Sequence, residues 1–588
     1  MRMGSRQMQS GRAWPYVLAT LALLCGVGFV YRIPLLIFAA PWIQAVLQPI
    51  GPTMVVPWSK GPAQARVDEA ERPNIVLIVA DDLGYNDITW RSHGAAPRVA
   101  GARGVGAGTV PTPNIDALAR EGVDFTQGYT GNATCAPSRA AIMTGRYATR
   151  FGYEFTPTPG MMTRYLAETA DKDSGLEYFS EFESQVPPFE QLGVPTSEVT
   201  LAEALKARGY HTVGMGKWHL GESDTTRAIS QGFDEFLGTN IMHADPDDPN
   251  IVNSRQDFDP IDKFLWRNMK AYARFNAGPR FLPPRYNTDF LADEAVRVIA
   301  ANRNRPLFLY LAFYAPHTPL QATRADYDAL PQITNHRERV YGAMVRALDR
   351  GVGKVLAQLK AQGLDRNTLV IFTSDNGGAD YVALPEINKP FRGWKMTFFE
   401  GGIRAPFFVR WPAVLPAGSY VDAPVGHIDI FPTALAAANG AAATGSSAST
   451  SPPPSPSPPP AASPSAGRKL DGVDLLPYAL GQVQGVPHQS LFWRSGQYSA
   501  IRVGDWKLQR NLRPNQRMLF DLRNDPTEQH DLAASQPVKL ASMTAELDRV
   551  DASMAKPLWP ALLESPHYVD HTILQENKPG DVFVTWPN

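Results

Sequence analysis

The chain has 588 residues, 44% of them hydrophobic, so it is long enough to form one large domain and a smaller one around substantial cores. Its 56 basic and 57 acidic residues give a formal net charge of -1, which excludes the broad basic field that a nucleic-acid partner needs. The only two cysteines are Cys25, in an apolar stretch, and Cys135, far downstream, so disulfides do not hold the protein together.

The first expected element is a hydrophobic segment near the N-terminus. Trp14 to Tyr31 is an uncharged run of 18 residues that follows Arg2, Arg6 and Arg12. At about 1.5 Å per residue it approaches the roughly 30 Å of a bilayer core, and the preceding arginines favour a cytoplasmic N-terminus. We therefore expect export of the rest of the chain to a periplasmic, lumenal or extracellular space. Residues 1–60 would be a membrane anchor, or a signal region cleaved within the second apolar run, Ile33 to Ile50.

Four short apolar runs in the middle of the chain each stop at polar residues. They are Ile75–Ala80, Tyr210–Met215, Leu307–Phe313 and Leu369–Thr373. Continuous apolar runs of this length are typical of buried parallel strands. Helical patterns lie between them, at Thr112–Gly122 and Arg337–Gln362, so the expected class is α/β with a large, mostly parallel sheet flanked by helices.

The polar residues that follow these runs are expected to meet at one edge of the sheet. They are Asp81 and Asp82 after the first run, Lys217 and His219 after the second, His317 after the third, and Asp375 and Asn376 after the fourth. Ligands of open parallel sheets bind beyond the carboxyl ends of the strands. Taken one at a time, these residues have ordinary explanations as caps, turns or surface charges, so their joint occurrence is the informative observation.

Composition also predicts the domain boundaries. Residues 440–468 are rich in proline, serine and alanine and cannot form a packed core, so we expect a disordered linker there. A catalytic domain over residues 70–439 would precede the linker. Strand-like residues in Leu491–Gln509 and Met518–Leu522 predict a smaller C-terminal subdomain, residues 469–588, with an antiparallel sheet.

The segment around Cys135 reads TCAPSRAAIMTGR. Pro137 suits the first turn of a helix and Gly145 its end, so Cys135 is expected at a helix N-terminus. Free backbone N–H groups and the positive end of the helix dipole favour a tetrahedral anion such as sulfate or phosphate at such a position.

CAPSR followed by TGR resembles the signature of the formylglycine-dependent (type I) sulfatases, the arylsulfatase family within the alkaline phosphatase-like superfamily. Seven further blocks resemble this family in its order: PNIVLIVADDLGYND, TPNIDALAREGVDFTQGYT, GYHTVGMGKWHLGE, APHTPLQ, TSDNGG, RGWKMTFFEGGIRAPFFVRWP and LFDLRNDPTEQHDLA. The similarity extends from about Pro73 to Ala534, with two low-complexity interruptions. Several ordered blocks are far more specific than one short motif.

The resemblance implies a sulfuric ester hydrolase whose Cys135 is oxidised by a formylglycine-generating maturation enzyme. The hydrated aldehyde would attack sulfur, and the resulting covalent sulfate ester would collapse through its second hydroxyl. Arg139 would orient the hydrate. One Ca²⁺ would be held by Asp81, Asp82, Asp375 and Asn376 together with the modified Cys135, since hard oxygen ligands suit Ca²⁺ or Mg²⁺ more than zinc.

The resemblance also implies roles for four further residues. Lys217 and Lys395 would balance the charge of the sulfate group, His219 would act as the base that assists collapse, and His317 would protonate the leaving alcohol or phenol. The organic part of the substrate is left open between aryl, carbohydrate and polysaccharide sulfates. It would be selected by the segments Tyr153–Pro195 and His243–Pro284, which match no family block.

Three alternatives are consistent with parts of the same sequence. A phosphodiesterase or phosphonate hydrolase of the same superfamily would also bind a tetrahedral anion. A membrane-anchored binder of sulfated ligands would keep the site without maturing Cys135. A cysteine hydrolase ranks last, because it would leave the acidic cluster without a role.

Overall fold

The computed structural model of the protein describes residues 46–65, 72–85, 87–90, 110–170, 174–440 and 468–588. Within these residues a central sheet of eleven strands has the order β1-β9-β8-β6-β5-β10-β2-β12-β13-β3-β14. The strands, in sheet order, are β1 (Ile50–Gly51), β9 (Arg280–Phe281), β8 (Ala273–Phe275), β6 (Glu235–Thr239), β5 (His211–Gly216), β10 (Leu307–Pro316), β2 (Asn74–Asp81), β12 (Thr368–Ser374), β13 (Phe407–Arg410), β3 (Val123–Tyr129) and β14 (Ser419–Gly426).

The four predicted strands are β5, β10, β2 and β12, and they are adjacent and parallel at the centre of this sheet. Every residue of β2 is buried. A strand buried on both faces cannot alternate apolar and polar residues, which explains the continuous apolar runs in the sequence. The prediction of a mostly parallel central sheet is therefore confirmed.

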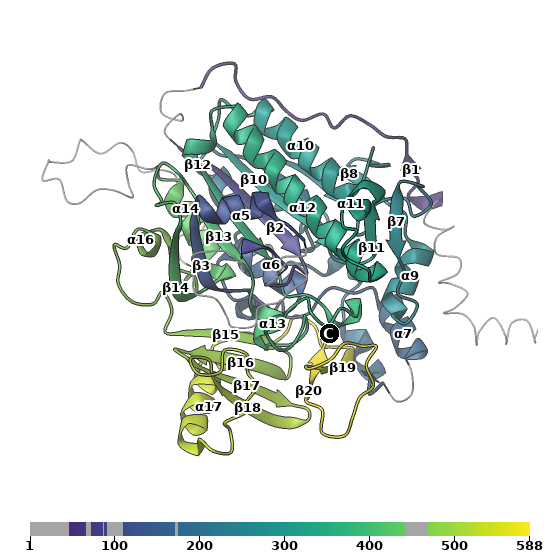
Figure 1. The fold of residues 1–588 in the computed structure, drawn as a ribbon, viewed down its shortest axis with the longest axis vertical. Coiled ribbons are helices and arrows are strands. Elements are labelled where there is room, and N and C mark those ends of the chain that lie inside the picture. The colour runs from purple at the N-terminus through teal and green to yellow at the C-terminus, as the bar shows by residue number, and fades with distance from the viewer. Residues whose placement is uncertain (1–45, 66–71, 86, 91–109, 171–173, 441–467) are drawn as a thin grey trace, which may run out of the picture.

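Helices cover both faces of the sheet (Figure 1). The side chains of Val76, Ile78 and Ala80 pack in one core with α5 (Pro113–Arg120), α10 (Asn287–Ala301) and α12 (His336–Ala361). The alternate residues Ile75, Leu77 and Val79 pack on the other side with α6 (Cys135–Thr144), α8 (Leu201–Lys206) and α14 (Ile430–Ala437). The α/β class is thus confirmed, and both helices predicted between the strands are present as α5 and α12.

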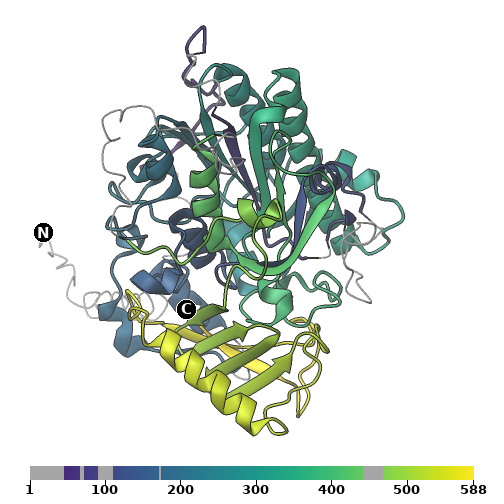
Figure 2. The ribbon, with the colours of Figure 1, turned by 90° about the vertical axis from the view of Figure 1, so that its left-hand side faces the viewer.

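A separate antiparallel sheet lies in the C-terminal part of the chain, as predicted (Figure 2). Its strands are β15 (Ser490–Ser495), β16 (Tyr498–Val503), β17 (Trp506–Leu512) and β18 (Asn515–Asp521), and α17 (Pro537–Asp551) packs on it. The chain then forms β19 (Leu563–Tyr568) and β20 (Phe583–Pro587), which pair with each other and with β4 (Glu177–Tyr178).

The two segments expected to select the substrate, Tyr153–Pro195 and His243–Pro284, contain regular structure. They include α7 (Gly160–Thr169), β7 (Ile251–Ser254) and α9 (Pro260–Asn268), and they supply β4, β8 and β9. These elements are short, so their apolar periodicity is too brief to read from sequence. The remaining strand and α-helices of the described residues are β11 (Leu320–Thr323), α11 (Arg324–Asp328), α13 (Glu400–Ile403) and α16 (Leu476–Ala479).

Two sequence predictions fall outside the described residues. The hydrophobic run Trp14–Tyr31 belongs to residues 1–45, and nearly all of the linker belongs to residues 441–467. Across the part of the chain that the structure describes, none of the helices has the length and apolar character needed to cross a membrane.

Candidate active site

The predicted polar residues meet at the carboxyl ends of the central strands. Asp81 is the last residue of β2, and Lys217, His317 and Asp375 directly follow β5, β10 and β12. The register sets Asp81 opposite Pro316 of β10, and Ala80 opposite Ser374 of β12, so these strand ends are adjacent. All four side chains are buried. The expectation that they share one edge of the sheet is correct.

Cys135 approaches this edge from the first residue of α6. Its Sγ lies 3.4 Å from Asp81 Oδ1 and 3.8 Å from Asp82 Oδ1. Lys217 Nζ donates to both carboxylate oxygens of Asp81, at 3.0 and 2.7 Å. The thiol therefore faces a charged cluster and not an apolar core.

A second group is centred on Asp82. Lys395 Nζ donates to Asp82 Oδ2 at 2.9 Å and lies 3.2 Å from His317 Nε2. The hydroxyl of Tyr381 donates to the same carboxylate oxygen at 3.1 Å and accepts from Lys395 at 2.9 Å. Asp82 has a positive φ of 61°. This conformation is uncommon for a residue other than glycine and is concentrated at functional sites.

Arg139 is fully buried beneath the cluster and pairs with Asp375. Its Nε and its terminal nitrogen both lie 2.8 Å from Asp375 Oδ2, and a further nitrogen lies 3.1 Å from the hydroxyl of Tyr310. One carboxylate oxygen of Asp375 is thus occupied by the guanidinium, while Oδ1 accepts from the amide of Asp82 at 3.2 Å.

Several ligand atoms at this edge are close enough to hold one metal ion. One ligand atom each from Asp81, Asp82, Cys135 and His317 lie within 4.8 Å of one another. Asn376 donates through Nδ2 to Asp82 at 2.7 Å, whereas its buried Oδ1 has no hydrogen-bond partner among the described residues. Buried polar atoms are rarely left unpaired, so this oxygen fits a missing ligand such as a cation. The group includes His317, which the sequence had suggested only as an acid.

Electrostatics keep Asp81, Asp82 and the two lysines ionised, whereas burial and the charge of Asp81 raise the pKa of Asp375 to about 6. Burial alone would raise the pKa of Asp81, but Lys217, His317 and Arg139 outweigh it and hold this pKa well below its ordinary value. Burial likewise opposes the charge of Lys395, yet Asp82 raises the pKa of Lys395 well above its ordinary value. The site is a buried set of mutually stabilised charges.

Cys135 itself differs from expectation in one respect. A nucleophile at a helix N-terminus would be expected to be accessible to solvent, but Cys135 is only 3% exposed. Burial, followed by the charge of Asp375, raises the pKa of its thiol far above the ordinary value. A thiol in this environment stays protonated, so it is poorly suited to act as a thiolate nucleophile.

The two histidines are held differently. His317 Nδ1 lies 2.6 Å from the carbonyl of Thr318, so the proton is assigned to Nδ1 and Nε2 carries a lone pair. Burial lowers the pKa of His317 to about 4, against the opposing effect of Asp82. His219 has a positive φ of 61°, and its buried Nδ1 lacks a hydrogen-bond partner in the described part of the chain. Burial and the neighbouring Lys217 hold the pKa of His219 well below its ordinary value.

Sequence reasoning missed two tyrosines of this site. Tyr310 was included in an apolar strand, and its hydroxyl reaches Arg139. Tyr381 lies five residues after Asn376, in a stretch without a recognisable motif. The only signal available was an aromatic residue with a polar tip close to a predicted strand end.

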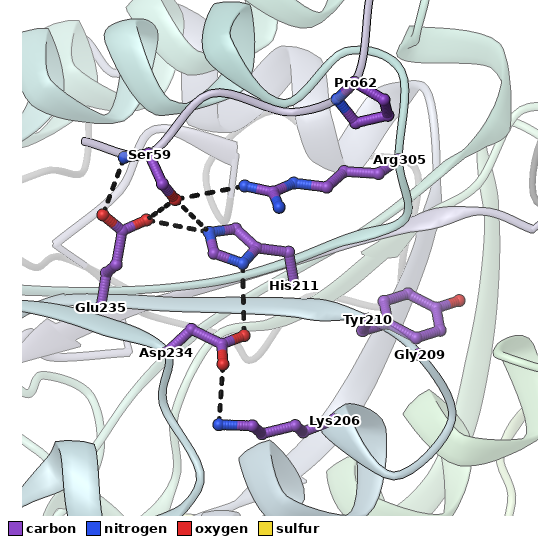
Figure 3. Close-up of a pocket in the computed structure, with 9 residues that line it drawn as sticks. All are labelled: Ser59, Pro62, Lys206, Gly209, Tyr210, His211, Asp234, Glu235 and Arg305. Atoms are coloured by element: carbon purple, nitrogen blue, oxygen red, sulfur yellow. Dashed lines mark hydrogen bonds and ion pairs between the residues drawn. The ribbon is translucent and has the colours of Figure 1, made fainter. Parts of the chain in front are cut away.

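A second charged cluster lines a surface pocket at the amino-terminal ends of the strands, opposite the candidate active site (Figure 3). His211, the first residue of β5, lies 2.9 Å from Glu235 and 3.2 Å from Asp234, and Lys206 lies 2.7 Å from Asp234. Ser59 donates to Glu235 at 2.7 Å. These charges satisfy one another, and none of the predicted site residues lines this pocket.

Fold and site together define a class: an α/β protein with a buried, oxygen-rich anion and metal site at the carboxyl edge of its parallel strands. A family model described as "Sulfatase" matches residues 73–441. N-acetylgalactosamine-6-sulfatase of Mus musculus is 34% identical over 445 residues, covering 74% of this chain and 71% of that protein. Steryl-sulfatase of Mus musculus is 31% identical over 506 residues, covering 73% and 69%.

Solved structures give the same result. The crystal structure of Ps i-CgsB in complex with k-i-k-neocarrahexaose matches with a TM-score of 0.63 and 30% identity, covering 83% of this chain and 94% of that one. A phosphonate monoester hydrolase from Silicibacter pomeroyi matches with a TM-score of 0.55 at 18% identity, covering 82% and 96%, and this similarity concerns the fold alone. The chain belongs to the sulfatase family and is an enzyme of the sulfuric ester hydrolase class.

Proposed function

We propose that the protein hydrolyses sulfate esters of aryl or carbohydrate alcohols, with a formylglycine made from Cys135 as nucleophile and one Ca²⁺ ion. The observation that carries the proposal is the position of Cys135, at a helix N-terminus and 3.4 Å from Asp81. Because the pKa of the Cys135 thiol is raised, the unmodified cysteine is poorly suited to attack sulfur as a thiolate. A formylglycine hydrate would supply a hydroxyl nucleophile and a second hydroxyl through which sulfate is released.

The residues present fit a hard divalent cation. Asp81, Asp82 and Asn376 offer carboxylate and amide oxygens, which are the ligand types that Ca²⁺ prefers. Asp375 would contribute the oxygen that does not pair with Arg139. When bound, the ion would polarise a sulfate oxygen as a Lewis acid.

The protein groups around it bind and orient the sulfate. Lys217 and Lys395 are buried cations that pair with Asp81 and Asp82, and the nearby N-terminus of α6 also favours an anion. Arg139 cannot reach bulk water and fixes Asp375, which keeps the floor of the site rigid. Preorganised charges of this kind supply the largest part of the catalysis in many enzymes.

Two histidines handle protons in the proposal. His317 would protonate the leaving oxygen from Nε2. This nitrogen carries a lone pair in the free site, so the ring would first take up a proton from solvent, which the negative charge of a bound sulfate ester favours. Lys395, 3.2 Å from Nε2, keeps its own proton because Asp82 raises its pKa. His219 is neutral because its pKa is lowered, so its ring can accept a proton from the nucleophile's hydroxyl during release of sulfate.

Phosphate and phosphonate esters are the competing substrates, because they too are tetrahedral anions. The test compares kcat/KM for 4-nitrophenyl sulfate with the values for 4-nitrophenyl phosphate and phenylphosphonate esters. We expect sulfate hydrolysis to dominate, and dominant phosphate or phosphonate hydrolysis would replace the assignment. If no ester is turned over but sulfated ligands bind, the protein is the unmatured binder instead.

The cellular setting is part of the proposal. The basic, then apolar N-terminus supports export, with residues 1–60 as an anchor or signal region and the catalytic domain, residues 70–439, on the non-cytoplasmic side. Residues 440–468 would link it to the C-terminal subdomain, residues 469–588. Maturation of Cys135 requires a formylglycine-generating enzyme as partner.

A further inference from the structure

The C-terminal segment reaches the loop that carries Lys395. The backbone amide of Gly393 donates to the carbonyl of Val569 at 3.1 Å, and Arg392 pairs with Asp570 at 2.6 Å. Arg392 and Asp570 are 178 residues apart in sequence. The end of β19 is therefore fastened beside the active-site loop, on the side of the molecule where Figure 1 shows β19 and β20 below the main sheet.

His567 of β19 contacts a second active-site loop. Its Nδ1 lies 3.1 Å from Asp380 Oδ2, and its Nε2 lies 3.1 Å from Ser565 Oγ. Asp380 begins the 3-10 helix Asp380–Val382. The next residue, Tyr381, donates to Asp82 at 3.1 Å, so the partner of His567 is adjacent in sequence to a side chain of the catalytic cluster.

The carboxylate of Asp380 fixes the orientation of the imidazole. Because a carboxylate accepts, the ring proton is assigned to Nδ1, and Nε2 then presents a lone pair. That lone pair accepts from the hydroxyl of Ser565. The side chain of His567 is 12% exposed, so the ring is held in place and still reachable from solvent. An acceptor held in this way suits a ligand hydroxyl.

A second carboxyl group lies close to Asp380. Asp259, the N-cap of α9, is buried, and burial with smaller contributions from Asp262 and Asp380 raises its pKa to about 7. A carboxyl group with such a raised pKa is partly uncharged near neutral pH, so it is a hydrogen-bonding group and not a fixed negative charge. β4, which belongs to the segment Tyr153–Pro195 expected to select the substrate, pairs with β19 at Leu563 and Glu564.

From this arrangement we propose that His567 is a positioning residue for a hydroxyl-bearing leaving group, such as the sugar unit of a sulfated saccharide. The inference rests on the proposed sulfatase function. The sulfate occupies the Asp81 and Asp82 cluster, and the organic part extends past Asp380. His567 Nε2 then accepts a hydrogen bond from a sugar hydroxyl in place of Ser565. An ester whose leaving group has no hydroxyl cannot make this hydrogen bond, so its hydrolysis should not depend on His567.

The test compares two substrate types in matured, full-length enzyme. His567→Leu removes the acceptor, and His567→Gln restores one. For galactose 6-sulfate and N-acetylgalactosamine 6-sulfate we expect His567→Leu to lower kcat/KM about tenfold, mainly through KM, which is the size of one hydrogen bond. His567→Gln should recover part of this loss. Hydrolysis of 4-nitrophenyl sulfate should be unchanged in both variants.

A matched control lies in the same segment. His571 pairs with Asp581 at 3.0 Å, and its side chain is also 12% exposed, but no described contact joins it to the loops of Tyr381 or Lys395. His571→Leu should leave both substrate types unaffected.

Three results would overturn the inference while leaving the sulfatase function intact. They are equal losses on both substrate types in His567→Leu, no loss on the sugar sulfates, and an unaltered enzyme that hydrolyses 4-nitrophenyl sulfate but neither sugar sulfate. Failure of the unaltered enzyme on every sulfate ester would instead contradict the proposed function, and this inference with it.

Discussion

The two ends of the central sheet carry clusters of the same residue types in different states. At the amino edge, His211 with Asp234, Glu235 and Lys206 forms a set of ion pairs that are partly open to solvent. At the carboxyl edge the lysines and carboxylates are buried, Asp82 has a positive φ, and Asn376 Oδ1 lacks a partner within the described structure. Function is indicated by buried charges together with a buried polar atom that has no partner, because such an arrangement costs stability unless a ligand completes it.

The largest expected effect at the carboxyl edge comes from Cys135→Ala. Without the residue that becomes the nucleophile, kcat for 4-nitrophenyl sulfate should fall at least about 10³-fold. Because Cys135 is buried, the unfolding free energy should also fall, by about 1 kcal/mol. Rate measurements and urea titration check both values. Near-normal turnover would remove the nucleophile assignment.

The next effect concerns the metal ligands. Chelation of Ca²⁺ should lower activity by roughly 10²-fold or more, and added Ca²⁺ should restore it. In Asn376→Ala the Ca²⁺ concentration for half-maximal activity should rise at least about tenfold. Ca²⁺ should also raise the Tm of the unaltered protein more than that of the variant, because a bound ligand stabilises the folded state. A Tm that does not respond to Ca²⁺ would contradict the ligand set.

Tyr381→Phe should have a smaller effect. It removes the hydroxyl that joins Lys395 to Asp82 and keeps the ring in place. We expect kcat/KM to fall about tenfold, the size of one hydrogen bond to a charged group. Unchanged kinetics would show that the hydroxyl is not needed to orient Lys395.

The smallest expected effect comes from changing His211, in the cluster at the amino-terminal ends of the strands. Burial alone would lower the pKa of His211, but Asp234 and Glu235 outweigh it and raise this pKa above its ordinary value. The folded state therefore binds the proton more tightly than the unfolded one. The resulting stabilisation is complete below about pH 6.5 and is lost as pH rises through the folded pKa. His211→Gln should abolish this part of the pH dependence, about 1 kcal/mol or less, without changing activity. A loss of turnover in His211→Gln would instead show that the His211 cluster influences catalysis at the carboxyl ends of the strands.

Sequence reasoning reached the catalytic edge through strand ends. Asp81, Lys217, His317 and Asp375 each follow an apolar run, and the parallel order of those strands brings them together. It also placed Cys135 at a helix start. These features depend on local patterns, which a single sequence displays.

The remaining features depend on contacts between distant segments. Tyr381 gains its role only when the loop after β12 folds over Asp82, and His567 only when β19 pairs with β4 and reaches Asp380. The burial of Cys135 likewise results from tertiary packing, so a helix N-terminus alone did not predict it. No local pattern carries this information.

The central claim is tested most directly by the chemical state of residue 135 in catalytically active enzyme. Mass spectrometry of the peptide that contains it should find the aldehyde or its hydrate, in a fraction that rises in proportion to specific activity across preparations. Fully active enzyme that carries only the unmodified thiol would contradict the account.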